Sequence, residues 1–391
     1  MSAKALLFRL RMSVSAKALI FITIILFSLT GCGLIEETEI SGLSIVQMLA
    51  IDENEDGELV VSLSLRDLRD ESKSAEESTE EDPQKGIITV SERSFSALER
   101  ELQKRYEKRL FWGHVDYFIF GEDVAQGNIY KHLDYFSNDP HFRLNANVYL
   151  AEGKASDLLL KSEEAGYYLP DYIEHFLVTS QLLSESSKMT LFELVSKREL
   201  PPEAFAIPRI SISENDNDIT LRIDGYGIMK DGYLVGYAEK EEAKGYNILR
   251  NKMSGLIIDL HFENADISLK QLKCKAKMTP ILENGQLKKI KINVESISNI
   301  LEIKSGDGSK ALDVVPELEA EQAKLISGYI DSIISKMKEN KADILGISGL
   351  YKRKFPKHYN SDNWDEVISN LEFEIVVNCK INKAYDSSEI Y

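Results

Sequence analysis

The stretch Val115–Ala151 reads VDYFIFGEDVAQGNIYKHLDYFSNDPHFRLNANVYLA and carries the argument for the fold of this chain. Its first six residues, Val115–Phe120, are mostly apolar and are followed by a glycine, as expected for a buried strand. A helical stretch follows from Glu122 to about Phe136, and Leu144–Ala151 again has the pattern of a strand. Strand, helix and strand in this order indicate an α/β sheet.

The rest of the first half continues this alternation. Ile40–Asp52 and Glu58–Leu65 are strand-like runs separated by the turn cluster DENEDG. Tyr168–Arg198 is mostly helical. Ser94 is a helix-capping residue, and apolar side chains recur after it on one helical stripe: Phe95, Leu98, Leu102 and Tyr106. The first half is therefore predicted to be α/β.

Strands dominate the second half. We expect hairpins that turn at Asp231-Gly232 and at Asn284-Gly285, because such pairs favour two-residue turns. A long helix is predicted over Val315–Glu339, and EFEIVVNCKIN (Glu372–Asn382) is predicted as a closing strand. This half is predicted to be α+β, with an antiparallel-rich sheet packed on the long helix.

Pro201-Pro202 is the clearest interruption of regular secondary structure in the chain and suggests a boundary between modules. We predict a signal peptide at residues 1–31, an N-terminal α/β module at 32–205 and a C-terminal α+β module at 215–391. The whole is predicted to be multi-domain, with mixed sheets flanked by helices.

The first 31 residues have the features of an export signal. They contain basic but no acidic residues, and the apolar block Ala18–Leu29 is shorter than the about 20 residues of a membrane span. Leu29-Thr30-Gly31-Cys32 resembles the lipobox of bacterial lipoproteins, in which diacylglycerol alkylates the cysteine. We predict Cys32 as the lipid attachment site. The alternative is an uncleaved helix with an incidental cysteine. Translation could start at either Met1 or Met12.

Composition narrows the classes of partner. The chain has 391 residues, 43% of them hydrophobic, and a formal net charge of −17. This apolar content is typical of globular proteins. Nucleic-acid binding calls for basic surfaces, so this class of partner is not expected. The negative charge also gives no help in adhering to anionic lipid, so the predicted anchor would hold the chain on a membrane.

Cys274 and Cys379 are the other two cysteines of the chain. Each alternates with apolar residues along a strand-like segment, so both are predicted to face inward. Buried free thiols are the favoured interpretation. A disulfide between core strands is the alternative, since export permits one. No Cys/His cluster has the spacing of zinc ligands, and we predict no metal and no cofactor.

Asp52, Asn54, Asp56 and Gly57 match the first ligand positions of a calcium-binding EF-hand loop. The last position, which needs a bidentate glutamate, is Leu63. The flanking residues also have the pattern of strands rather than helices. We interpret the segment as a hairpin turn and reject calcium.

Three further stretches hold candidate polar groups. His114 and Asp116 stand two residues apart, as do Asp259 and His261, a spacing that lets a carboxylate orient an imidazole for base catalysis. No GxSxG motif accompanies them, so a structural role is favoured. YKRKFPKH (Tyr351–His358) is a basic patch. A solvated loop is the favoured interpretation, and contact with lipid phosphates or an acidic partner is the alternative.

Four longer stretches occur in an informative order. After the lipobox come EISGLSIVQMLAID (Glu39–Asp52) and LFWGHVDYFIFGEDVAQGNIYKHLDYFSNDPHFRLNANVYLAEGKASDLL (Leu110–Leu159). The second half holds GYGIMKDGYLVGYAEKEEAKGYNIL (Gly225–Leu249) and ADILGISGLYKRKFPKHYNSDNW (Ala342–Trp364). Together they resemble the Ger(x)C family, the C subunits of bacterial spore nutrient germinant receptors. The resemblance covers essentially the whole mature chain.

The resemblance implies a lipoprotein on the outer face of the spore inner membrane. It implies assembly with two integral membrane subunits, A and B, into a receptor that responds to nutrients. It also implies an α/β fold without catalytic residues, so only Cys32 carries over. We therefore expect a non-enzymatic receptor subunit, and the resemblance does not specify which nutrient the receptor recognises. A lipoprotein that binds a solute for an uptake system is the alternative, and an extracytoplasmic hydrolase using His114 is a third hypothesis.

Overall fold

The computed structural model describes residues 21, 42–66, 87–106, 108–183, 186–198, 204–215, 218–253, 255–262, 265–304, 315–360 and 363–382. Apart from Leu43, the first residue of β1, the folded elements below belong to the compact unit Ser44–Tyr391. Within the described ranges, every helix is too short or too polar to cross a bilayer.

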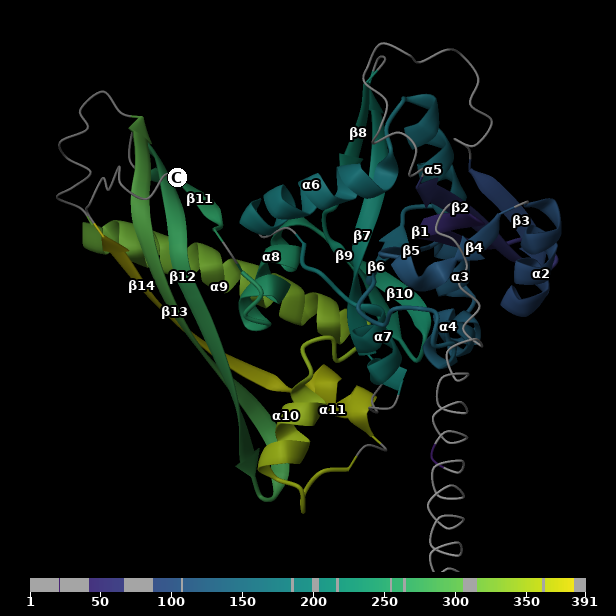
Figure 1. Cartoon of the computed structure of the whole chain (residues 1–391). Coiled ribbons are helices and arrows are strands. Elements are labelled where there is room, and N and C mark those ends of the chain that lie inside the picture. Colours follow the sequence, from purple (N-terminus) through teal and green to yellow (C-terminus); the bar gives the residue numbers. More distant parts are fainter. Residues whose placement is uncertain are drawn as a thin grey trace, which may run out of the picture. The chain divides into compact units, whose positions relative to one another are not determined.

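A ten-stranded mixed sheet is formed by strands between residues 43 and 238 (Figure 1). Its strands are β1 (Leu43–Glu53), β2 (Leu59–Arg66), β3 (Ile88–Glu92), β4 (Arg109–Phe111), β5 (Tyr117–Phe120), β6 (Asn147–Ala151), β7 (Ala204–Asn215), β8 (Asp218–Arg222), β9 (Tyr226–Lys230) and β10 (Tyr233–Ala238). The order is β10-β9-β7-β6-β5-β1-β2-β3, with β4 paired to β1 and β8 to β7. Strands β1, β5, β6 and β7 are parallel, and antiparallel strands extend the sheet on both sides.

Helices cover both faces of this sheet. Helices α2 (Phe95–Arg105), α3 (Glu122–Gln126), α4 (Leu133–Asn138) and α7 (Leu191–Arg198) share one core with Leu49 and Ile51 of β1. Helices α5 (Ala155–Glu164) and α6 (Leu169–Leu183) share the other core with Met48 and Ala50. Neighbouring residues of β1 thus enter opposite cores, as strand geometry requires. The predicted α/β sheet flanked by helices is confirmed.

The predicted helix from Glu122 to about Phe136 is interrupted. It consists of α3, the 3-10 helix η5 (Ile129–His132) and α4. Asn128 separates the first two pieces and has a φ of 82°, outside the helical region. Glycine and asparagine in the sequence QGN therefore end the first piece.

The second sheet has the order β11-β12-β13-β14. Its strands are β11 (Ile257–Phe262), β12 (Ala265–Glu283), β13 (Gln286–Lys304) and β14 (Glu372–Asn382), and only the last pair is parallel. One face packs in a shared core with four helices, α8 (Lys240–Leu249), α9 (Val315–Glu339), α10 (Ile347–Lys354) and α11 (Trp364–Asn370). The predicted antiparallel-rich sheet on a long helix is confirmed (Figure 1).

Both predicted hairpins turn where expected. Asp231-Gly232 joins β9 to β10, and Asn284-Gly285 joins β12 to β13. All four residues have positive φ, between 52° and 86°. Positive φ at both central positions defines the turn type that suits the twist of paired strands.

Strand β7 runs through the region where the sequence placed the module boundary. Strands β8, β9 and β10 lie beyond that region and pair within the first sheet. In addition, Tyr226 and Ile228 of β9 share a core with α8 and α9. The division into modules at 32–205 and 215–391 therefore stays a prediction.

Candidate functional site

Cys32, the predicted site of lipid attachment, lies outside the described residues. The same holds for the rest of the predicted signal peptide except Phe21. Lipid attachment at Cys32 therefore stays a prediction.

The turn after β1 is stabilised by its own polar groups. The side-chain oxygen of Asn54 accepts hydrogen bonds from the N–H groups of Asp56 and Glu58, at 3.1 and 2.9 Å. Asp52 is buried, and its carboxylate accepts the two N–H groups that open helix α5, at 2.7 and 2.8 Å. Strands β1 and β2 form the predicted hairpin around this turn.

The structure brings neither predicted histidine–aspartate pair together. His114 is exposed at the end of the 3-10 helix η4 (Trp112–His114), and no hydrogen bond joins these two described residues, His114 and Asp116. Asp259 and His261 each bond instead to the residue directly opposite on β12, at 2.5 and 2.7 Å. Asp259 and His261 therefore stabilise the pairing of β11 and β12, as the favoured interpretation had it. The His114 ring lies 5.6 Å from that of Phe111, and a structural role for His114 stays a prediction.

Cys274 on β12 and Cys379 on β14 both lie opposite Ser296 of the central strand β13. Both thiols are free and pack against the core of the second sheet. Burial raises the pKa of Cys274 to about 12 and that of Cys379 to about 11. Two strand spacings of about 4.8 Å separate their backbones, beyond the about 7 Å that a disulfide spans.

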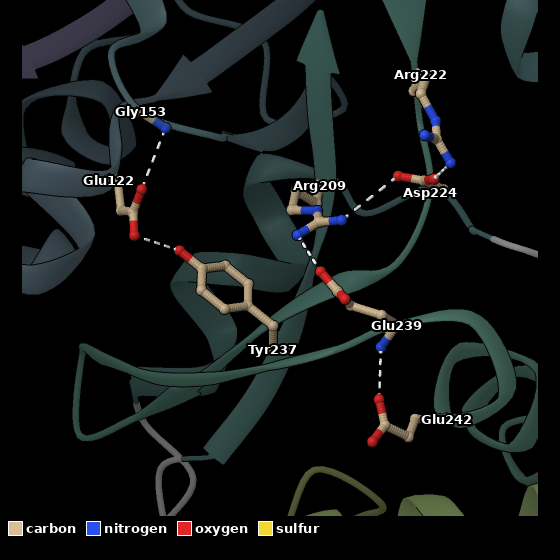
Figure 2. Close-up of polar contacts among 8 residues, drawn as sticks. All are labelled: Glu122, Gly153, Arg209, Arg222, Asp224, Tyr237, Glu239 and Glu242. Carbon is tan, nitrogen blue, oxygen red and sulfur yellow. Dashed lines mark hydrogen bonds and ion pairs between the residues drawn. The ribbon is translucent and has the colours of Figure 1, made fainter. Parts of the chain in front are cut away.

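A cluster of charged side chains lies beyond the carboxyl ends of the parallel strands β5 and β6, the place where α/β sheets commonly bind ligands (Figure 2). Its side chains come from α3, β7, β8, β10, α8 and the loops between them. We call this group the Arg209 cluster: Glu122, Arg209, Arg222, Asp224, Tyr237, Glu239 and Glu242, with the backbone of Gly153.

Arg209 forms the centre of the cluster. Its side chain is 14% exposed, and one terminal nitrogen donates a hydrogen bond to Glu239 while the other lies 3.7 Å from Asp224. The guanidinium carbon stands 5.5 Å from the centre of the Tyr237 ring. A charge so far removed from water is costly unless partners surround it, and two carboxylates and an aromatic face do so here.

Tyr237 links this centre to the ends of β5 and β6. Its hydroxyl donates a 2.5 Å hydrogen bond to one oxygen of Glu122, whose other oxygen accepts the N–H of Gly153 at 3.1 Å. Burial, followed by the hydrogen bond to Glu122 and the charge of that residue, raises the pKa of Tyr237, so the hydroxyl stays protonated and acts as the donor. Figure 2 shows the resulting path from Gly153 through Glu122 to the tyrosine.

The Arg209 cluster joins segments that are far apart in the sequence. Glu122 joins the start of α3 to the residues after β6 and to strand β10, and Arg209 of β7 contacts β10 and the start of α8. The members of the cluster lack a serine, threonine or cysteine nucleophile. Within the described ranges, no group of three or more histidine, cysteine, aspartate or glutamate residues is arranged to hold a metal ion. The arrangement is suited to positioning loops.

Sequence reasoning missed this cluster. The available signal was Arg209 itself, which follows Pro208 in the strand run AFAIPRISI. A charge inside an apolar strand demands a buried partner. The partners come from residues between 122 and 239, so local spacing does not identify them.

The basic segment Tyr351–His358 is partly helical. Lys352, Arg353 and Lys354 form the last turn of α10, and Lys357 follows the helix. All four side chains are exposed. The favoured interpretation as a solvated loop therefore holds only for its second half.

Two family models match the chain in sequence order. "Spore germination protein N-terminal domain" matches residues 36–212, and "Spore germination B3/ GerAC like, C-terminal" matches residues 224–384. Together they account for most of the chain.

Curated relatives and one solved structure agree with these matches. Spore germination protein B3 of Bacillus subtilis (strain 168) is 21% identical over 90% of this chain and 93% of its own length. Spore germination protein KC of the same organism is 21% identical, over 89% and 90%. The crystal structure of the GerBC protein is similar in fold, with a TM-score of 0.55 and 18% identity over 85% of this chain and 96% of that chain.

Proposed function

Because the chain belongs to the Ger(x)C family of spore germination proteins, we propose that it is the lipid-anchored C subunit of a nutrient germinant receptor. The subunit works in spore germination without catalysing a reaction itself. It is held by Cys32 on the outer face of the spore inner membrane. There it assembles with two integral membrane subunits, A and B.

The observation that carries this proposal is the order of the matches. Both family domains occur in one chain, and residues 1–35 precede the first of them. Those residues contain the basic start, the short apolar block and the lipobox that ends at Cys32. Two acyl chains anchor a protein stably, whereas one does so only marginally.

The chemistry of the Arg209 cluster supports a non-enzymatic role. Its charged groups bond to one another and to backbone groups, as in Figure 2. Groups so engaged hold the surrounding segments of the chain in position. The third hypothesis is a hydrolase that uses His114. This side chain is exposed, and none of the described residues makes a hydrogen bond with it that would orient it for base catalysis.

Affinity isolation from detergent-solubilised spore membranes tests the assembly. We expect two multi-pass membrane proteins to co-purify with the tagged chain and to be lost when Cys32→Ala removes the anchor. Cys274→Ala is the matched control, because its thiol lies in the core, and it should retain both partners. Co-purification of transport-system components instead would replace the proposal by the solute-binding alternative. Recovery of the chain alone would contradict assembly.

Mass spectrometry of the mature N-terminus tests the anchor separately. We expect the mature chain to begin at Cys32 and to carry a diacylglyceryl thioether. The Cys32→Ala variant should keep its signal peptide and carry no lipid. An unmodified Cys32 in a membrane-bound chain would contradict the lipid anchor.

A further inference from the structure

The face of the second sheet that turns away from the helices carries a row of lysines. Cys274, Ala276 and Met278 of β12 pack toward the core, so the residues between and before them point to the opposite face. These are Lys273, Lys275 and Lys277, and all three are exposed. In the described part of the chain, no helix contributes to a core on that face.

A second group of cations lies where β12 ends. Lys352, Arg353 and Lys354 form the last turn of α10, followed by Lys357. Figure 1 shows α10 beside the end of the β12–β13 ribbon where the hairpin turns.

The two groups meet at one edge of β12. Beyond Gln271 this edge has no strand neighbour among the described residues, and side chains bind its backbone instead. Asn251 bonds to both backbone groups of Ala276, and Lys354 donates to the carbonyl of Pro280 at 3.3 Å. The helical cations therefore lie at the same edge of β12 as the end of the lysine row, while α10 itself packs on the core face of the sheet. We call the combined surface the basic band: Lys273, Lys275, Lys277, Lys352, Arg353, Lys354 and Lys357.

The charges of the basic band are not neutralised within the described structure. None of its seven side chains makes an ion pair with a carboxylate of the described residues. Their neighbours on the same sheet do: Lys288 lies 2.7 Å from Glu372, and Lys291 lies 3.0 Å from Glu374. Glu295 is opposite Lys275 in the register but does not reach it as an ion pair. In a chain of net charge −17, this band is a local excess of positive charge.

We propose that the basic band is a docking surface for an anionic lipid bilayer. Charge complementarity is the first argument, since clustered lysines and arginines near a membrane bind anionic headgroups. The second is the presence of two aromatic residues beside these cations, Phe355 and Tyr359, which pack partly against the core and are half-exposed. Lysine Nζ atoms lie 5.3 and 5.6 Å from the centres of their rings. Aromatic and basic side chains together are typical of membrane interfaces. The inference rests on the proposed membrane location, and it gives the second sheet a defined side toward the lipid.

Protection of an exposed strand edge explains only part of the band. Lysines on β12 deter pairing with another chain, as edge strands require. Arg353 and Lys357 lie on a helix and the loop after it, where edge protection has no role.

Vesicle co-flotation of the mature chain with Cys32→Ser, which carries no acyl chain, tests this inference. We expect binding to phosphatidylcholine vesicles that contain phosphatidylglycerol, weakening with added salt, and no binding to phosphatidylcholine alone. Each basic residue contributes about fivefold in affinity, so Lys352→Gln, Arg353→Gln and Lys357→Gln together should weaken binding by roughly a hundredfold. A second triple variant, with Lys273→Gln, Lys275→Gln and Lys277→Gln, should weaken binding to a similar extent.

The matched control removes three exposed lysines elsewhere: Lys104→Gln, Lys131→Gln and Lys324→Gln. This control has the same net charge as each triple variant of the basic band. It should bind the vesicles as well as the Cys32→Ser chain without further substitutions. No binding of the Cys32→Ser chain to anionic vesicles would overturn the inference and point to an acidic protein as the partner. An equal loss in the control would also overturn it, because binding would then follow net charge and not the basic band. Because the vesicles contain no other protein, this test stands even if the A and B subunits fail to co-purify.

Discussion

The carboxylate of Asp52 accepts a 2.7 Å hydrogen bond from the backbone N–H of Ala155, 103 residues further along the chain. Its second oxygen accepts the next N–H of α5 at 2.8 Å. The N-cap residue of this helix, Lys154, supplies no side-chain bond of its own. Asp52 is 3% exposed. The end of strand β1 thus supplies the cap of a helix that follows β6.

We expect Asp52→Ala to lower the free energy of unfolding by about 2 kcal/mol, because two helix-opening N–H groups lose their acceptor in a buried place. Asp52→Asn keeps one acceptor oxygen and should cost less. Urea unfolding measures both. Asp56→Ala, in the exposed turn that follows, is the control and should change stability by less than about 0.5 kcal/mol. Equal effects at the two positions would contradict the capping role.

Asp52 also shows what the sequence could and could not predict. Its neighbours in DENEDG identified a turn correctly, because a turn is defined by residues next to one another. Its bond to Ala155 depends on how β1 and β6 are placed in the sheet, which local spacing does not contain. The same holds for Arg209. By contrast, Ser94 accepts from the N–H of Ala97, within one turn of helix, and was identified from the sequence as a cap.

The hydrogen bond between Tyr237 and Glu122 should couple the two residues energetically. In a double-mutant cycle with Tyr237→Phe and Glu122→Gln, we expect a coupling of about 1–2 kcal/mol, since one partner is charged and the pair is half-buried. Thermal or urea unfolding of the four proteins gives this value. Tyr233→Phe, at an exposed position of the same strand, should show no coupling to Glu122→Gln. Additive effects for the first pair would refute the link.

Asp343 makes stability depend on pH in a defined direction. Burial raises the pKa of its carboxyl group, although the N–H groups of Ile347 and Ser348 donate to it at 2.8 and 2.7 Å. A carboxyl group whose pKa is higher in the folded than in the unfolded state contributes most to stability below its unfolded pKa, which is about 4. This contribution to stability is lost as the pH rises through the folded pKa. Asp343→Asn should therefore gain stability relative to the unmodified chain as pH increases from about 4 to 7.

Urea unfolding at several pH values measures this difference. Asp331→Asn, at an exposed position of α9, is the control, and its difference from the unmodified chain should not rise in the same way. A difference for Asp343→Asn that is flat or falls with pH would contradict the burial argument.

The two core cysteines should react slowly in the folded protein. Their raised pKa values, about 12 and about 11, leave little thiolate near neutral pH, and thiolate is the reactive form. With an aromatic disulfide reagent and the Cys32→Ser chain, which has no other cysteines, we expect labelling of Cys274 and Cys379 to be slower by roughly a hundredfold than after unfolding in urea. Single serine variants assign the two signals. Failure of the unfolded, unreduced chain to release any thiol would show a disulfide instead.

Two glycines of the packed helices α8 and α9 should respond in opposite directions to the same substitution. A Cβ on Gly245 would lie 2.0 Å from the backbone oxygen of Tyr329 on α9, and backbone cannot move aside locally. Gly245→Ala should therefore lower the free energy of unfolding by about 2 kcal/mol or more, since overpacking forces the helices apart. Gly328, one residue before Tyr329, has no atom within 4 Å of its Cβ position. Gly328→Ala should raise stability by about 0.5–1 kcal/mol, because alanine favours the helix and restricts the unfolded chain.

Urea unfolding of the two glycine variants separates a packing effect from helix propensity. Propensity alone favours alanine at both positions, so only the contact between α8 and α9 gives Gly245→Ala the opposite sign. The contact also fixes strand β10, which leads directly into α8, against the long helix under the second sheet. A Gly245→Ala variant as stable as Gly328→Ala would mean that α8 and α9 can move apart without loss of stability. The close contact between these helices would then not be needed to hold the two sheets on their common core.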